Sequence, residues 1–138
     1  MASVSVESIG NYRMLNSSNG HAWIGDEPAG VGDGLGPDPY ELLLSALGSC
    51  TAMTVTMYAR RKGWALENVR VDASHERIHA KDCEECEERD GQIDQFALKI
   101  EFEGDLDEDQ RKRLLEIAAR CPVRRTLTSG PRVVDPAG

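Results

Sequence analysis

An uncharged stretch spanning residues 42–58 is the feature that most constrains how this chain can fold. Asp38 lies just before it and can cap a helix, Pro39 suits the first helical position, and Glu41 completes a capping box. Cations and then a glycine follow the stretch, which is the usual way for a helix to end. We therefore predict a helix over residues 39–62. A helix that is apolar on most sides is expected to be buried on most sides.

The predicted helix carries a thiol at its centre. Its core-like positions are Leu42, Leu43, Ala46, Leu47, Met53 and Met57. Cys50 lies on the stripe formed by Leu43, Leu47, Thr54 and Met57. A membrane span is an alternative by length, since about 17 apolar residues are the lower limit for one, but the Ser and Thr side chains favour a core helix. The thiol is then either an inert core residue or a reactive group.

Length and composition indicate an ordinary soluble protein. The 138 residues fit a single domain over residues 1–138, and 29% charged with 40% hydrophobic residues is typical of globular chains. The net charge of −8 argues against nucleic acid and anionic membranes as partners. The first residues lack the pattern of a secretory signal, so we expect a cytoplasmic protein whose four cysteines are reduced at rest.

Short strands are predicted before the helix, within residues 1–25, where apolar and polar residues alternate and an Asn-Gly pair indicates a hairpin turn. Arg13 is the lone cation of this segment and is either solvated or functional. Residues 25–38 are rich in glycine and proline and read as an irregular loop. Asp26 and Glu27 in this loop are either solvated or part of a lid or subunit contact.

After the helix, two alternating segments predict a β-hairpin over residues 68–104, with its loop at residues 80–92. A second helix is expected over residues 107–120. Asp107 can cap it, and Gln110 occupies the capping-box position. The chain is therefore predicted to have an α+β fold.

The second helix leads directly to another cysteine. Cys121 follows Leu114 by seven residues and continues the apolar face of that helix. Pro122 ends the helix and suits the first position of a new short one. Cys121 would then lie beside a helix N-terminus and near Arg124, and both conditions lower the pKa of a thiol. A last short strand is expected at residues 133–134.

Cys50 and Cys121 each lie on the apolar face of a helix, so the two thiols are expected to meet in one core. Such a pair is either inert or a redox couple. In a redox couple, one thiolate attacks a peroxide and becomes a sulfenic acid, which then condenses with the second thiol. This chemistry requires a lowered thiol pKa and a second thiol within reach.

Cys83 and Cys86 form a CxxC motif among acidic residues, which raise thiol pKa values and disfavour nucleophilic use. His79 precedes the motif by four residues, so that two thiolates and nearby imidazoles could hold a zinc ion. An exposed loop, a metal site, and a disulfide or redox pair remain as readings of Cys83 and Cys86.

Two segments resemble one known family. GPDPYELLLSALGSCTAMTVTMYARRKGW and RLLEIAARCPVRRTLTSG are similar to the two cysteine segments of the OsmC/Ohr proteins, and the HAKDCEEC loop resembles the general OsmC-like branch. The resemblance implies an α+β fold with two central helices packed between antiparallel sheets. It also implies an intertwined homodimer.

The same resemblance implies a thiol-dependent peroxidase in which Cys50 is the peroxidatic cysteine and Cys121 the resolving one. It implies reduction of organic or hydrogen peroxides, no metal or bound cofactor, and a dithiol reductant such as a dihydrolipoyl protein. The alternative is a non-enzymatic protein of the same fold that binds a small ligand, or a metal at Cys83 and Cys86.

The resemblance also nominates groups around the reactive thiol. Family enzymes have a Glu ten residues before the reactive cysteine, where this chain has Tyr40, so Glu41 is the nearest carboxylate. Arg13 is the candidate for the arginine that pairs with the thiolate. Arg124 occupies a position that is usually His in this branch, and it can hold an anion although it cannot shuttle a proton at neutral pH.

Overall fold

The computed structural model describes residues 1–83 and 91–136. The chain forms two compact units, Met1–Leu43 and Leu44–Gly138. The described residues contain three α-helices and two antiparallel sheets, which confirms the predicted α+β class. The candidate peroxidatic and resolving cysteines both belong to the second unit.

The first unit contains a three-stranded antiparallel sheet in the order β1-β2-β3, with β1 (Ser5–Ser8), β2 (Met14–Ser18) and β3 (His21–Gly25). Asn19 and Gly20 join β2 to β3 with φ angles of 49° and 79°. Positive φ at both central residues is the geometry of the tight hairpin turn that an Asn-Gly pair favours. The predicted short strands and hairpin are therefore confirmed.

The loop after β3 is organised by a buried carboxylate. Asp26 accepts backbone hydrogen bonds from Glu27 at 2.7 Å, Leu35 at 3.1 Å and Asp33 at 3.5 Å. Burial raises the pKa of Asp26, but these N–H donors and the charge of Arg13 outweigh it and hold the pKa below its ordinary value. A solvated Asp26 is thus contradicted, because this side chain is buried and fixes the loop.

Helix α1 (Pro39–Lys62) has the predicted bounds. The Asp38 carboxylate accepts a hydrogen bond from the backbone N–H of Glu41 at 2.8 Å, and the Glu41 side chain accepts one from the N–H of Asp38 at 3.1 Å. This reciprocal pair is the predicted capping box, and it satisfies donors that the first turn of a helix leaves open.

Only one side of α1 is buried within the chain. The buried residues follow a four-residue spacing: Leu47, Thr51, Val55 and Ala59. Met53 and Met57, which were expected in the core, are 64% and 72% exposed. The expectation of burial on most sides is therefore wrong for the single chain. The length and apolar composition of α1 would also allow it to cross a membrane. Core helices of soluble proteins have the same length and composition, so this is weak evidence for a membrane span.

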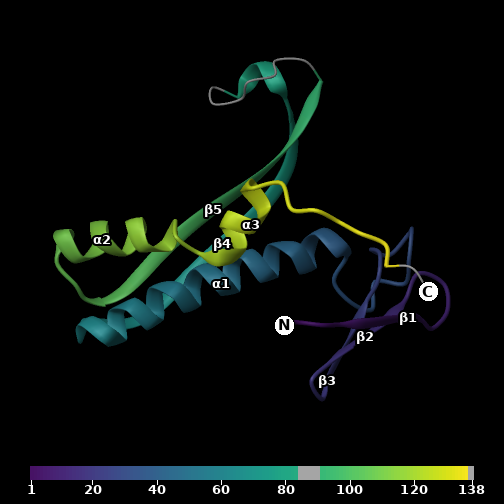
Figure 1. Ribbon diagram of the computed structural model, residues 1–138, viewed down its shortest axis with the longest axis horizontal. Helices are drawn as coiled ribbons and strands as arrows, with labels where there is room; N and C mark the ends of the chain where they lie inside the picture. The colour runs from purple at the N-terminus through teal and green to yellow at the C-terminus, as the bar shows by residue number, and fades with distance from the viewer. Residues whose placement is uncertain (84–90, 137–138) are drawn as a thin grey trace. The chain divides into compact units, whose positions relative to one another are not determined.

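The second unit contains two long antiparallel strands, β4 (Ala65–His79) and β5 (Gln92–Asp105). They form a twisted ribbon that runs beside α1 (Figure 1). The hairpin is confirmed, and its strands are longer than the alternating segments predicted. A short 3₁₀ turn, η1 (Ala80–Asp82), follows β4.

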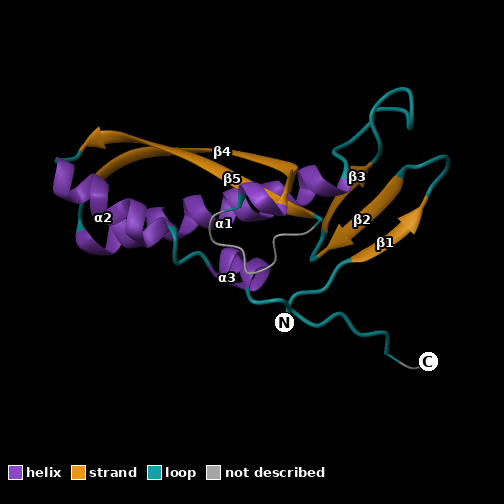
Figure 2. Cartoon of the chain, turned by 90° about the horizontal axis from the view of Figure 1, so that it is seen from above, coloured by secondary structure: helices purple, strands orange, loops and turns teal. Residues whose placement is uncertain are grey.

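Two further helices complete the second unit, α2 (Glu108–Ala118) and α3 (Pro122–Thr128). Figure 2 shows the helices on the same side of the β4–β5 ribbon. Asp107 and Gln110 form the predicted capping box of α2, with hydrogen bonds of 2.7 and 3.0 Å.

The hydrophobic core of this unit lies where α1 and α2 meet the ribbon. Its buried members are Val55, Ala59, Leu106, Leu114 and Ala118. Phe102 and Ile100 of β5 pack against them. The core thus holds together the elements that carry the two cysteines.

The predicted strand at residues 133–134 is not formed. Val133 and Val134 lie in irregular backbone and are exposed. Two β-branched residues alone are too short a segment to predict a strand, because β-propensity depends on pairing with a neighbouring strand.

Candidate functional site

Cys50 and Cys121 form a pair of thiols, which we call the dithiol. Cys50 lies in the middle of α1 and is half-buried, whereas Cys121 is fully buried. Both are free thiols, and their side chains act on each other as hydrogen-bond partners. The structure therefore brings together the two cysteines that the sequence placed on separate apolar faces.

Helix α2 and the proline after it fix the position of Cys121. Leu114, Ile117 and Ala118 bury one face of α2. The chain then turns, with the N–H of Cys121 donating to the Ala118 carbonyl at 3.3 Å, and Pro122 starts α3. Because Pro lacks an N–H and has a preset φ, it favours a new helix start there. Cys121 becomes the N-cap residue of α3 and stays in the core.

The surroundings of Cys121 favour its thiolate. Burial raises the pKa of Cys121, but partners that stabilise the anion outweigh it: the side chain of Cys50, the backbone N–H of Arg124, the hydroxyl of Thr51 and the N–H of Val123. The Cys121 side chain makes no capping hydrogen bond at the start of α3. The pKa of Cys121 lies below its ordinary value, as the sequence predicted.

Cys50 has the opposite preference. Burial and the neighbouring sulfur of Cys121 raise its pKa, and the N–H of Val123 and the hydroxyl of Thr54 oppose this only in part. Two thiols in contact share one titration, so the first proton is lost from the pair as a whole.

The other residues predicted for the site are Arg13, Glu41 and Arg124, and each has its own partners in the structure. Arg13 lies in the first unit, where its Nε donates to the Gly10 carbonyl at 3.3 Å and lies 3.7 Å from the Asp33 carboxylate. Glu41 is engaged in the capping box of α1. Arg124 has an exposed side chain and acts on Cys121 through its backbone N–H.

The CxxC motif is separate from the dithiol in the sequence and differs from it in chemistry. Cys83 is disulfide-bonded, and Cys86 lies outside the described residues. His79 is exposed at the end of β4. Within residues 1–83 and 91–136, the His, Cys, Asp and Glu side chains form no group of three that could hold a metal. The disulfide at Cys83 contradicts the expectation that all four cysteines are reduced, and a metal at Cys83 and Cys86, which requires free thiolates, stays a prediction from sequence.

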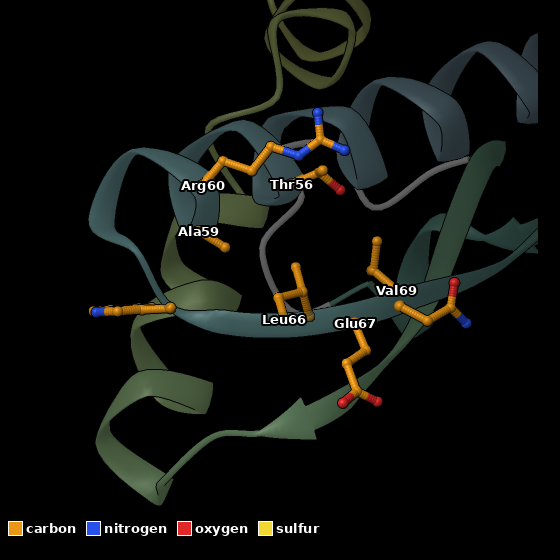
Figure 3. Close-up of a pocket in the computed structure, with 8 residues that line it drawn as sticks. Thr56, Ala59, Arg60, Leu66, Glu67 and Val69 are labelled. Atoms are coloured by element: carbon orange, nitrogen blue, oxygen red, sulfur yellow. The ribbon is translucent and has the colours of Figure 1, made fainter.

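A small pocket in the second unit lies away from the dithiol sulfurs. It has a volume of about 140 Å³ and opens between the end of α1 and the start of β4. Figure 3 shows Thr56, Ala59 and Arg60 on its helix side and Leu66 and Val69 on its strand side. Neither cysteine of the dithiol lines it.

Thr51 and Thr54 are site residues that the sequence analysis missed. Thr51 is fully buried, and its hydroxyl lies near Cys121, whereas Thr54 is the hydroxyl partner of Cys50. The signal was present but unused: Thr51 shares the four-residue spacing of Leu47 and Val55, which places a hydroxyl on the buried face of α1.

Solved structures share this fold at low sequence identity. An OsmC-like protein from Mycoplasma pneumoniae matches with a TM-score of 0.74 at 19% identity, over 94% of this chain and 89% of that one. An organic hydroperoxide resistance protein OsmC from Legionella pneumophila matches with 0.65 at 16%, over 92% and 88%. The organic hydroperoxide resistance protein OhrB of Bacillus subtilis matches with 0.64 at 15%, over 94% and 92%.

The sequence itself gives the family. A search among curated proteins finds no match. A family profile described as "OsmC-like protein" matches residues 32–134. These residues include both thiols of the dithiol and the helices α1, α2 and α3. This match covers well over half of the chain, and it agrees with the fold. The chain therefore belongs to the OsmC-like protein family.

Proposed function

We propose that the protein is a thiol-dependent peroxidase that reduces organic hydroperoxides or hydrogen peroxide through Cys50 and Cys121. The observation that supports this is the dithiol itself: a half-buried thiol next to a fully buried one whose thiolate is favoured. Two solved structures of this fold carry the name of organic hydroperoxide resistance proteins, which agrees with a peroxide substrate.

The proposed reaction uses two electrons from the dithiol. The Cys50 thiolate attacks one peroxide oxygen, so that an S–O bond forms and the O–O bond breaks. Cys50 becomes a sulfenic acid, and the leaving alkoxide takes a proton from water to give the alcohol. The sulfur of Cys121 then attacks Cys50, an S–S bond forms, and the sulfenic oxygen leaves as water with the proton of Cys121.

The two cysteines divide these roles by their exposure. A peroxide must reach the attacking sulfur, and Cys50 is the more accessible of the two. The resolving sulfur has no need to meet the substrate, and Cys121 is buried beside Cys50. This division favours Cys50 as the peroxidatic residue. The pKa of Cys50 is raised and not lowered as peroxide attack requires, and this counts against the role in the single reduced chain.

Disulfide mapping tests the proposal. The reduced protein is treated with an equimolar amount of cumene hydroperoxide or hydrogen peroxide, and its disulfides are mapped by mass spectrometry. We expect a Cys50–Cys121 disulfide that forms faster than a free thiol oxidises and that is absent in Cys50→Ser. The Cys121→Ser variant should accumulate a sulfenic acid on Cys50. A dithiol that stays reduced in the native protein would refute the peroxidase.

We also propose that the protein is a homodimer. Met53 and Met57 expose a large apolar surface on α1, a helix without charge between residues 42 and 58. Apolar surface of this kind on a core helix favours association with a second copy. Sedimentation should give twice the chain mass, and Met57→Glu should shift it toward the monomer. A native monomer at micromolar concentration would refute the dimer.

The reductant and the location complete the proposal. Regeneration of the disulfide requires a dithiol donor, for which a dihydrolipoyl protein is the expected source. A cytoplasmic location fits a reaction that depends on reduced thiols. Turnover of peroxide with dihydrolipoamide, compared with glutathione, tests the class of reductant.

A further inference from the structure

The first unit has a pocket of its own on one face of its three-stranded sheet, which we call the sheet pocket. Its volume is about 300 Å³, at the lower end of the range for small-molecule sites. It is distinct from the pocket of Figure 3, which lies in the second unit. All the residues that line the sheet pocket lie between Val6 and Leu42, so it belongs to the first unit alone.

The walls of the sheet pocket are mainly apolar. Met14 and Asn16 lie two residues apart on β2, and Val6 of β1 pairs with Asn16, so these three side chains share one face of the sheet. Leu42 of α1 and the ring of Tyr12 also line the pocket. Such walls fit a ligand with an apolar or aromatic body.

Two buried polar side chains, Asn16 and Asp26, also line the sheet pocket. Asn16 is 8% exposed and Asp26 is 3% exposed. Asn16 donates a hydrogen bond from Nδ2 to the Met14 carbonyl at 3.2 Å, and no described residue donates one to its Oδ1. Buried polar groups are normally hydrogen-bonded, so this acceptor suits a donor that enters the pocket.

The charge of the first unit favours a cation in the sheet pocket. Asp26 and Glu27 both line it, and backbone N–H groups hold the pKa of Asp26 below its ordinary value, so this carboxylate is ionised at neutral pH. Arg13 is the only Lys or Arg of the unit, against six Asp and Glu residues. The Arg13 guanidinium lies 3.7 Å from the Asp33 carboxylate and does not line the pocket.

The positive end of α1 does not reverse this preference. Pro39, the first residue of α1, lines the sheet pocket but has no N–H to donate. The N–H of Glu41 already donates to the Asp38 carboxylate at 2.8 Å. Asp38 thus places a negative charge at the helix start, where an anionic ligand would otherwise be favoured.

We propose that the sheet pocket binds a small organic cation, a primary ammonium group on an apolar or aromatic body. An ammonium group has three N–H donors, which suit the Oδ1 of Asn16 and the carboxylates of Asp26 and Glu27. The ring of Tyr12 offers a face that attracts a cation, and the apolar walls receive the body. The proposal is independent of the peroxidase, whose two cysteines lie in the second unit.

A matched set of ligands tests the proposal on the native protein. Benzylamine carries an ammonium group at neutral pH, and benzyl alcohol has nearly the same shape without the charge. We expect benzylamine to bind with a Kd on the order of 1 mM, benzyl alcohol to bind about tenfold more weakly, and benzoate not to bind. Equal affinities for benzylamine and benzyl alcohol would overturn the inference, because shape alone would then explain the binding.

The indole N–H signals of the two tryptophans in an NMR titration show where the ligand binds. Trp23 of β3 pairs with Asn16 and shares its face of the sheet, whereas Trp64 lines the pocket of Figure 3 in the second unit. Benzylamine should shift the Trp23 signal, which Trp23→Phe identifies, and leave the Trp64 signal in place. A Trp23 signal that does not move well above the expected Kd would overturn the inference.

A pair of variants tests the role of the charge. Glu27→Gln removes a carboxylate from the sheet pocket, and Glu7→Gln removes the same group from the opposite face of the sheet, since Glu7 follows Val6 in β1. Glu27 bonds to the Asp26 carboxylate through its backbone N–H, which Glu27→Gln leaves in place. Glu27→Gln should weaken benzylamine binding about threefold and leave benzyl alcohol unchanged, whereas Glu7→Gln should change neither. Equal effects of the two variants would indicate a general attraction to the acidic chain and would overturn the inference.

Discussion

The packing of α2 against the core can be tested by a pair of adjacent leucines. Leu114 is 0% exposed and lies in the cluster with Val55 and Ala59 of α1, whereas Leu115 is 50% exposed. Both are in the interior of α2, so a change to Ala has the same effect on helix propensity. The difference between Leu114→Ala and Leu115→Ala therefore measures burial alone.

The expected magnitude follows from the surroundings of Leu114. A buried Leu→Ala change costs about 2–5 kcal/mol, and more where the neighbours cannot collapse into the space. The neighbours of Leu114 belong to different elements, α1, α2 and the segment after β5, so we expect about 3 kcal/mol or more. Leu115→Ala should cost less than about 1 kcal/mol.

Urea denaturation followed by circular dichroism measures both values. With a slope of about 2 kcal/mol per molar urea, a loss of about 3 kcal/mol lowers the midpoint by about 1.5 M. Protein concentration is held equal for all variants, because association stabilises the folded state. Equal losses for Leu114→Ala and Leu115→Ala, or a loss below about 1 kcal/mol at Leu114, would refute this description of the core.

Two further predictions concern a glycine and a carboxylate. Gly104 has φ of 141°, and a Cβ there would meet the Ala65 carbonyl, so Gly104→Ala should cost about 1–3 kcal/mol of folding stability in urea. Gly91→Ala, at positive φ but in open space, should cost less, and the reverse order would contradict this reading. The pKa of Asp26 is below its ordinary value when folded, because backbone N–H groups hold the carboxylate. Asp26 therefore stabilises the fold above its unfolded pKa, and this stabilisation is lost as the pH falls through the folded pKa. Asp26→Asn should therefore show a weaker loss of stability between neutral and acidic pH, and unchanged acid unfolding curves would contradict it.

The sequence predicted the elements better than their burial. The bounds of α1 follow from local signals, the capping box at Asp38 and the cations at its end, and these act within a few residues. The buried face of α1 could not be predicted in the same way, because the uncharged part of the helix has no charged side that would indicate which face is exposed to solvent. Met53 and Met57 are apolar like Val55, and only the packing of Val55 in the core cluster with α2 and the ribbon separates them.

The candidate site shows the same limit in another form. The spacing of Cys121 after Leu114 predicted its burial, and Pro122 predicted the helix start beside it, so the lowered pKa of that thiol was foreseen. Asp26 was not foreseen as buried, because its partners Asp33 and Leu35 are brought to it only by the folded loop. Sequence patterns predict the environment of a residue when its partners are close in the chain. They do not predict burial that depends on partners brought together only by the fold.

The proposed peroxidatic thiol has no free carboxylate at the position where the family resemblance places one. That position holds Tyr40, and the next carboxylate, Glu41, is engaged in the capping box. In the proposed reaction the resolving cysteine is needed only for the second step, in which the disulfide forms. Cys121→Ser should therefore still form a sulfenic acid on Cys50 and should lack the disulfide. A Cys121→Ser protein that forms no sulfenic acid on Cys50 would show that Cys121 also takes part in the attack on the peroxide.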